Sequence, residues 1–279
     1  MEIEQLMRPS IKDEYGIQKL QNIILNVMKV IHDLCERHHI DYYIIGGTAL
    51  GAVRHGGFIP WDDDLDIAMT RDNYDKFIEI CKNEVDPNEF FLQEGRKDWH
   101  LYFSKLRLKH TTFNEEHSAN ENIPIENRGI FVDIFPLDHA SNCKLGRLWQ
   151  YGCSKILIAY GMRGVKYDND SMKKKVVKAF AAVLKIKLFR DYLMNQITKY
   201  NEKGTNYLGD FFDKTSFKDA SYPKSLWGKP NLIQFENTKL YAPEKLHDYL
   251  EFYFGDYMQL PPVEKRVCGH HSNLDFGKY

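Results

Sequence analysis

The fold is decided by residues 42–67, which read YYIIGGTALGAVRHGGFIPWDDDLDI. The stretch begins with a short β-rich run at residues 42–45, continues through two glycines, and enters a segment from Thr48 to Val53 that favours a helix. This order predicts a strand, a tight turn and a helix. Backbone N–H groups at such a turn and at a helix N-terminus can bind phosphate oxygens, so Gly46, Gly47 and Thr48 are candidate substrate-binding residues.

The second half of the same stretch concentrates carboxylates. Asp62, Asp63, Asp64 and Asp66 fall within five residues, and the last two flank Leu65 in an apolar run that predicts a second strand. Residues two apart on a strand face the same side, so the Asp64 and Asp66 carboxylates should converge. Such a density of negative charge favours a divalent cation, and oxygen ligands suit Mg²⁺ or Mn²⁺. Asp62 and Asp63 also fit a solvated acidic turn.

A single acidic residue marks a later strand. Residues 129–135 are strongly apolar apart from Asp133, and Pro136 is expected to end the strand. We expect Asp133 to complete a three-carboxylate metal site with Asp64 and Asp66, and to accept a proton in catalysis. The alternative is a buried aspartate satisfied by backbone donors.

These motifs resemble the LicD family of phosphotransferases, which includes the fukutin-related proteins. The match runs almost without departure from Gly46 to Ile67, with a second block at Phe131 to Pro136 and a third at Tyr253 to Val267. The resemblance implies a nucleotidyltransferase-like fold. It also implies transfer of an alcohol phosphate, such as phosphocholine, from a CDP-activated donor to a hydroxyl of a cell-surface glycan or lipid-linked glycan, with release of CMP.

Several basic residues are further candidates to bind substrate. Arg54 and His55 follow the predicted helix, and an arginine there can donate to two phosphate oxygens. Lys105 and Arg107 lie two apart on a predicted strand and so share a face, which fits phosphate contact or a solvated strand face. Asp62, Arg266 and His270 complete the candidate set, the last two because they match the basic ending of the family.

The coarse class is α+β, a small mixed sheet flanked by helices. An amphipathic pattern predicts a helix within residues 11–39, and further patterns predict helices at 71–81 and 243–254 and strands at 90–93 and 101–108. We divide the chain into a core with the metal site at 1–140, a basic helical insert at 141–205, and a C-terminal segment at 206–279 that returns to the core.

Charge is distributed unevenly along the chain. The net charge is −1, yet residues 141–200 hold 13 Lys or Arg and three Asp, which leaves 25 basic and 36 acidic residues elsewhere. The basic segment is typical of contact with an anionic partner, and we expect an anionic membrane surface rather than nucleic acid. The alternative is a set of solvated helices that cover the active site.

The remaining sequence features limit which functions the protein can have. The N-terminus lacks a signal-peptide pattern, and the five cysteines are scattered, so we expect a cytoplasmic protein with reduced thiols. Two other functions fit the same residues: transfer of a nucleoside monophosphate from a triphosphate, and binding without catalysis. The alcohol is not defined by the sequence; Trp99, Tyr102, Tyr207 and Trp227 are candidates for an aromatic cage around a quaternary ammonium.

Overall fold

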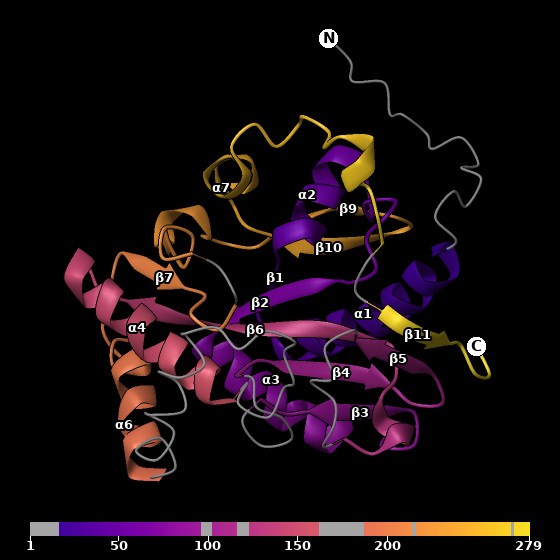
Figure 1. Ribbon diagram of the computed structural model, residues 1–279, viewed down its shortest axis with the longest axis horizontal. Coiled ribbons are helices and arrows are strands. Elements are labelled where there is room, and N and C mark those ends of the chain that lie inside the picture. Colours follow the sequence, from indigo (N-terminus) through magenta and orange to yellow (C-terminus); the bar gives the residue numbers. More distant parts are fainter. Residues whose placement is uncertain (1–16, 96–101, 116–122, 162–186, 214–215, 269–270) are drawn as a thin grey trace.

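A mixed seven-stranded sheet forms the centre of the computed structural model, which describes residues 17–95, 102–115, 123–161, 187–213, 216–268 and 271–279. The main path of strands is β1–β2–β6–β4–β3, and Figure 1 shows helices around it. The bounds are β1 (Tyr43–Ile44), β2 (Asp66–Thr70), β6 (Phe131–Ala140), β4 (Ser104–Leu108) and β3 (Phe90–Gln93). The predicted mixed sheet with flanking helices is confirmed, whereas the division into three segments stays a prediction.

The pairing of β2 with β6 is the one parallel pairing in the described sheets. It sets Asp66 opposite Asp133, and β4 then pairs with β6 in the antiparallel sense with Lys105 opposite Asp133. Three residues from distant parts of the chain are therefore neighbours across three adjacent strands. Since side chains opposite one another in a sheet share a face, all three point to the same side.

Two helices cover the other face of this sheet. They are α1 (Gln18–His38) and α3 (Arg71–Glu84), which confirm two of the predicted helices, although residues 11–16 lie outside the described part of the chain. Ile67, Leu106 and Ile134 alternate with the polar residues named above and are fully buried. The sheet therefore has an apolar face under α1 and α3 and a polar face on the opposite side.

A second layer is built around α2 (Gly46–His55). Figure 1 places α2 beside α7 (Leu246–Phe254) and above the hairpin of β9 (Asn231–Phe235) and β10 (Thr238–Ala242). The predicted turn before this helix is wrong in detail, because Gly46 and Gly47 form the first turn of α2 itself. Gly46 adopts φ +53°, a conformation that favours glycine.

Strand β6 continues through Pro136, so the expected stop at this residue is wrong. The Asp133 N–H donates to Leu65 O on the β2 side, and alternation turns the nitrogen of Pro136 toward the opposite side. On that side β4 pairs only as far as Ile134, and the next partner, β7 (Tyr207–Gly209), begins at Asp138. Proline is tolerated there because no ladder hydrogen bond is required of its nitrogen.

The remaining elements flank the sheet. Helices α4 (Lys144–Gly161) and α6 (Lys187–Thr198) pack on each other and on the end of β6, over a second apolar cluster that includes Leu157 and Phe211. The other elements are β5 (Thr112–Glu115), β8 (Ser221–Pro223), β11 (His271–Asp275) and short 3-10 helices at Ile125–Asn127, Lys224–Leu226 and Val263–Lys265.

Two further sequence expectations can be compared with these elements. All five cysteines are free, as expected. Among the described residues, no helix combines the length and the apolar character needed to cross a membrane.

The close contact between α2 and the following loop gives a first prediction. A Cβ at position 51 would lie 2.4 Å from Gly57 O, whereas a Cβ at position 152, within α4, meets nothing within 4 Å. Gly51→Ala should therefore destabilise the protein by about 1–3 kcal/mol, because backbone must move. Gly152→Ala should stabilise it by about 0.5–1 kcal/mol through helix propensity. Urea unfolding of both variants measures this, and equal midpoints would contradict the proposed packing.

Candidate active site

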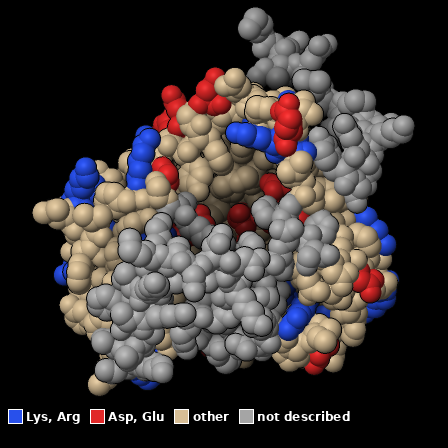
Figure 2. Space-filling model, in the orientation of Figure 1, with Lys and Arg blue, Asp and Glu red and all other residues tan. Residues whose placement is uncertain are grey.

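The candidate active site lies at the start of β2 and β6, on the polar face of the sheet. The face seen in Figure 2 has a hollow with acidic atoms at its floor. Asp66 is the centre of this acidic cluster: burial raises its pKa well above the ordinary value, and Asp64, Asp133, Asp62 and Asp213 raise it further. Four of these five carboxylates were singled out in the sequence, and the structure brings them within electrostatic reach of one another.

A buried ion pair fixes Asp133. Lys105 Nζ lies 2.8 Å from Asp133 Oδ1 and 3.2 Å from Oδ2, and the lysine is only 1% exposed. Its ammonium also lies 3.5 Å from the centre of the Phe131 ring. Lys105 thus reaches the site, where it binds a carboxylate in this structure rather than facing solvent.

Arg107 does not reach the site surface. It is fully buried, and it donates to Gln93 Oε1 at 2.6 Å and to Gly129 O at 2.9 Å. It shares a face with Lys105, as expected, because both cations lie over the Phe131 ring. The expected phosphate contact of Arg107 finds no exposed surface here, so this residue holds β3, β4 and the chain before β6 together.

The chemistry of this donor set fits a hard divalent cation. Carboxylate oxygens are the ligands that Mg²⁺ and Mn²⁺ prefer. Burial first, and then the neighbouring carboxylates, raise the pKa of Asp66, and a bound cation would offset both effects. In the described part of the chain, however, no three His, Cys, Asp or Glu side chains are gathered in a metal-ligand arrangement. Asp64 and Asp66 would hold the cation, and the third ligand, Asp133, stays a prediction.

The start of α2 is bound to the acidic strand. Thr48 Oγ1 accepts a hydrogen bond of 2.9 Å from the Asp66 N–H, and the Gly46 N–H donates to Tyr249 Oη at 3.0 Å. A Cβ at Gly47 would lie 2.8 Å from Asp62 Oδ2. The glycine therefore lets the Asp62 carboxylate lie close to the backbone at the start of α2. The three residues predicted to bind phosphate therefore lie next to the carboxylates, and two of them position backbone and acidic groups there.

Two arginines lie close together near the same loop. Arg54 Nη1 donates to the carbonyls of Tyr257 and Gln259, and burial followed by the charge of Arg266 lowers the pKa of Arg54. Within the described structure, the buried Nε of Arg54 has no hydrogen-bond partner. An anion bound between the two guanidinium groups would reduce the repulsion between them.

Two aromatic rings accompany these arginines. The Arg266 guanidinium lies 5.5 Å from the Trp61 ring centre, and the His55 ring lies 5.9 Å from the same ring. His55 and Arg266 are thus brought together as candidate binding residues, whereas His270 lies outside the described residues. Asp63, by contrast, is buried and accepts a hydrogen bond from the Cys268 thiol, so it is not part of a solvated turn.

Three residues in this region were not identified from the sequence: Lys155, Asp210 and Asp213. Asp210 is buried, and burial followed by Asp213 raises its pKa, while Lys155 of α4 donates to Asp213 O at 2.6 Å. No spacing rule connects residues 155, 210 and 213 to residues 64–66. The one available signal was a pair of aspartates around two phenylalanines at 210–213, which an apolar environment makes unusual.

The aromatic cage candidates are dispersed. Trp227 is 2% exposed among Tyr43, Tyr222 and Tyr249, so it cannot line an open cage. Tyr102 stacks on Phe212, Tyr207 lies under Arg147, and Trp99 is outside the described residues. These four side chains do not identify the alcohol.

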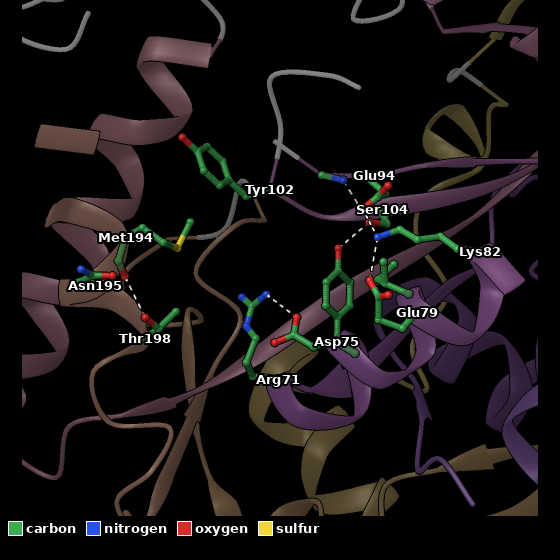
Figure 3. A pocket seen from close by; sticks show the side chains of 13 residues that line it. Arg71, Asp75, Glu79, Lys82, Glu94, Tyr102, Ser104, Met194, Asn195 and Thr198 are labelled. Atoms are coloured by element: carbon green, nitrogen blue, oxygen red, sulfur yellow. Dashed lines mark hydrogen bonds and ion pairs between the residues drawn. The ribbon is translucent and has the colours of Figure 1, made fainter. Parts of the chain in front are cut away.

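A second cavity, of about 550 Å³, lies between α3, α6 and the ends of β3 and β4 (Figure 3). Its cations are already paired: Arg71 donates to both oxygens of Asp138, and Lys82 binds Glu79 and Glu94. Ser104, which lines this cavity, precedes Lys105 on β4, so the cavity is on the α3 side of the sheet. It is separate from the acidic cluster.

Comparison with known proteins matches this region to a described family. Residues 39–155, which contain Asp62, Asp64, Asp66, Lys105 and Asp133, match the family model described as LicD/FKTN/FKRP, nucleotidyltransferase domain. Residues 39–155 therefore carry a LicD-family domain. The lipopolysaccharide cholinephosphotransferase LicD of Haemophilus influenzae is 28% identical over 259 residues, which is 91% of this chain and 96% of that protein.

Two further similarities cover shorter stretches. Uncharacterized proteins of Rickettsia typhi and Rickettsia prowazekii are 46% and 48% identical over 57 and 50 residues. These matches cover 20% and 18% of this chain and 18% and 19% of the two proteins. Neither name indicates an activity.

The buried pair gives a second prediction. Lys105→Met should destabilise the protein by about 3–5 kcal/mol, because it leaves the Asp133 carboxylate buried beside an apolar side chain. Adding Asp133→Asn should recover part of this loss, so the two changes are not additive. Lys187→Met, which breaks the exposed pair of Lys187 with Asp191, is the control and should cost at most about 1 kcal/mol. Additivity within about 0.5 kcal/mol in urea unfolding would contradict the coupling.

The acidic cluster gives a third prediction, about pH and metal. Because the folded-state pKa of Asp66 is raised, its ionised form destabilises the fold above that pKa, and this loss is removed as pH falls through it. Asp66→Asn should therefore raise the metal-free melting temperature at neutral and alkaline pH, with a difference that shrinks on acidification. Mg²⁺ should raise the melting temperature of the unmodified protein more than that of the variant. Thermal unfolding followed by circular dichroism measures both, and an equal Mg²⁺ response would contradict the assignment.

Proposed function

We propose that this protein is a metal-dependent phosphotransferase that moves phosphocholine, or a similar alcohol phosphate, from a CDP-activated donor to a hydroxyl of a glycan. The observation that carries the proposal is the acidic cluster of Asp64, Asp66 and Asp133 at the start of two parallel strands. Arg266, whose charge acts on Arg54, lies over the ring of Trp61, which directly precedes the acidic stretch. The name of the Haemophilus influenzae relative supports phosphocholine as the group and lipopolysaccharide as a type of acceptor.

The residues have distinct roles in this reaction. A bound Mg²⁺ or Mn²⁺ would supply neutralisation of the diphosphate charge, and Asp64 and Asp66 would hold it. Arg54 and Arg266 bind phosphate oxygens, which would reduce the repulsion between their two charges. Lys105 fixes the orientation of the Asp133 carboxylate through its two short contacts.

The transfer itself conserves atoms and charge. The acceptor hydroxyl oxygen attacks the phosphorus that bears the alcohol, the bond from that phosphorus to the bridging oxygen breaks, and CMP leaves with the bridging oxygen. Asp133 accepts the proton of the attacking hydroxyl. The products are the alcohol-phosphate ester of the glycan and CMP.

The partners follow from the same chemistry. The donor is a CDP-alcohol, and the acceptor is a glycan or a glycan carried on a lipid. We place the reaction in the cytoplasm, at the inner face of the membrane, because this is where a CDP-activated donor and a lipid-linked acceptor would meet.

One alternative has a specific observation in its favour. The matched family model is described as a nucleotidyltransferase domain, and transfer of a nucleoside monophosphate from a triphosphate would use the same carboxylates. Pyrophosphate rather than CMP would then be the product. A binding module without catalysis is less consistent with the intact acidic cluster around Asp66.

The test is a donor panel with product identification. The protein is incubated with Mg²⁺, a glycan acceptor and CDP-choline, CDP-ethanolamine, CDP-glycerol or CDP-ribitol, and CMP is measured by chromatography. We expect CMP release with at least one donor and none after metal chelation. Pyrophosphate release from a nucleoside triphosphate, with no CMP from any donor, would replace the proposal by the nucleotidyltransferase alternative.

Site variants give the fourth prediction. Asp64→Asn and Asp66→Asn should each lower turnover to less than about a tenth, because the metal should supply several kcal/mol of barrier reduction, while the fold is retained. Asp72→Asn, an exposed aspartate in the first turn of α3, is the matched control and should leave turnover unchanged. More than about a tenth of the activity in either site variant would remove that residue from the metal site.

A further inference from the structure

Lys105 is a buried cation on the acidic face of the sheet. It extends from β4, which pairs with β3 on one side and with β6 on the other. The β4–β6 register sets it opposite Asp133, and its Nζ lies 2.8 Å from Asp133 Oδ1 and 3.2 Å from Oδ2. One ammonium therefore contacts both oxygens of one carboxylate. A metal ion can hold a carboxylate through both oxygens in the same way.

Two aromatic rings fix the position of this ammonium. Lys105 Nζ lies 3.5 Å from the centre of the Phe131 ring and 5.6 Å from the centre of the Phe103 ring. Phe131 packs edge-on against Phe113 at 5.1 Å between ring centres. Phe103 stacks on Phe135 at 4.3 Å. Because both rings are held by further core contacts and attract a cation, Lys105 supplies a positive charge at one defined place beside Asp133.

The Asp66 side of the acidic cluster differs from the Asp133 side. Strands β2 and β4 flank β6 (Figure 1), and neighbouring strands lie about 4.8 Å apart, so Asp133 is placed between Asp66 and Lys105. After burial, the charges that act most on Asp66 are four carboxylates, and all of them raise its pKa. The negative charge that a divalent cation would offset is therefore concentrated at Asp66, on the side of Asp133 away from Lys105.

We propose that Lys105 takes the place of a second metal ion, so that the protein holds one divalent cation at Asp64 and Asp66, and Asp133 is not a ligand of it. This inference rests on the proposed function and deepens it, because it states how many metal ions the reaction uses. In two-metal phosphoryl transfer, the two cations stabilise the attacking and the leaving oxygens. Here a lysine would serve one of these two oxygens.

The two positive charges would have different positions in the proposed transfer. Asp133 accepts the proton of the attacking hydroxyl, so the Lys105 ammonium would lie on the side of the attacking oxygen. Asp64 and Asp66 would hold the cation on the side of the diphosphate. An ammonium donates hydrogen bonds but does not coordinate a hydroxyl oxygen, so removal of the hydroxyl proton would depend on Asp133.

A metal site with three carboxylates is the alternative. It requires Asp133 to turn from Lys105 toward the metal, which gives up two short contacts with a buried ammonium. Separating a buried ion pair is costly, because both charges have already lost their hydration. The arrangement with one metal ion keeps the pair intact and needs the smaller rearrangement.

Counting bound Mn²⁺ tests the inference without a substrate. The full-length protein is titrated with Mn²⁺, and free Mn²⁺ is measured by electron paramagnetic resonance. We expect one Mn²⁺ per chain, and Asp66→Asn should weaken its binding more than about tenfold. Two Mn²⁺ per chain in the unmodified protein would overturn the inference.

A double variant tests whether Asp133 is a ligand. Lys105→Met with Asp133→Asn removes one positive and one negative charge, so the net charge of the site is unchanged. We expect one Mn²⁺ per chain and an affinity that falls less than about tenfold, because loss of a group that holds the metal costs about 10–100-fold. A larger fall would overturn the inference. Lys187→Met with Asp191→Asn makes the same changes in an exposed pair and is the matched control, with unchanged binding expected.

Lys105→Met alone tests the replacement of a metal ion by the ammonium. Without the ammonium, the Asp133 carboxylate should bind a second Mn²⁺, so we expect two per chain and a larger rise in melting temperature with Mn²⁺ than in the unmodified protein. One Mn²⁺ in the folded variant would show that Lys105 has only a structural role, and would overturn the inference. If this variant does not fold, the unmodified protein and the double variant decide.

The Mn²⁺ counts and the donor panel can fail separately. CMP release by a protein that binds two Mn²⁺ would overturn this inference and keep the proposed function. One Mn²⁺ per chain, retained in the double variant, with no CMP from any donor, would overturn the proposed function and keep the single-metal site.

Discussion

The parallel pairing of β2 with β6 is the constraint on which the site depends. It sets Asp66 opposite Asp133, and the antiparallel partner β4 then sets Lys105 opposite the same aspartate. Because side chains alternate along a strand, the same register sends Ile67, Ile134 and Leu106 into the core under α1 and α3. A slip of one residue would bury the carboxylates under the helices and expose the apolar side chains, so the stability of the core and the position of the acidic site have one cause.

The acidic stretch before β2 is held by contacts from all parts of the chain. Gln21 of α1 donates to the carbonyls of Ile59 and Asp62, and Glu236 of the β9–β10 hairpin accepts from the Phe58 N–H. Thr48 and Tyr249 bind the start of β2 and the start of α2. These bonds offset the repulsion between neighbouring carboxylates, so the acidic stretch can keep its conformation before a cation binds.

Opposite charges are separated within the candidate site. The carboxylates converge around Asp66, while Arg54 and Arg266 approach each other near Trp61. Each group is unfavourable by itself, since burial and like charge raise the pKa of Asp66 and lower that of Arg54. A divalent cation and a diphosphate would relieve the two together, which is the physical basis for reading this arrangement as a phosphotransferase site.

The sequence by itself determined the helices of the core, the acidic strand and the resemblance to the LicD family, because hydrophobic periodicity and the motif at residues 46–67 are local patterns. It also singled out Asp64, Asp66 and Asp133. Only the tertiary structure decided that Lys105 binds Asp133, that Arg107 is buried, that Tyr249 binds Gly46, and that Asp213 lies near the cluster. It also decided that β6 passes through Pro136. These outcomes depend on strand register and on partners up to 203 residues apart, which local spacing does not encode.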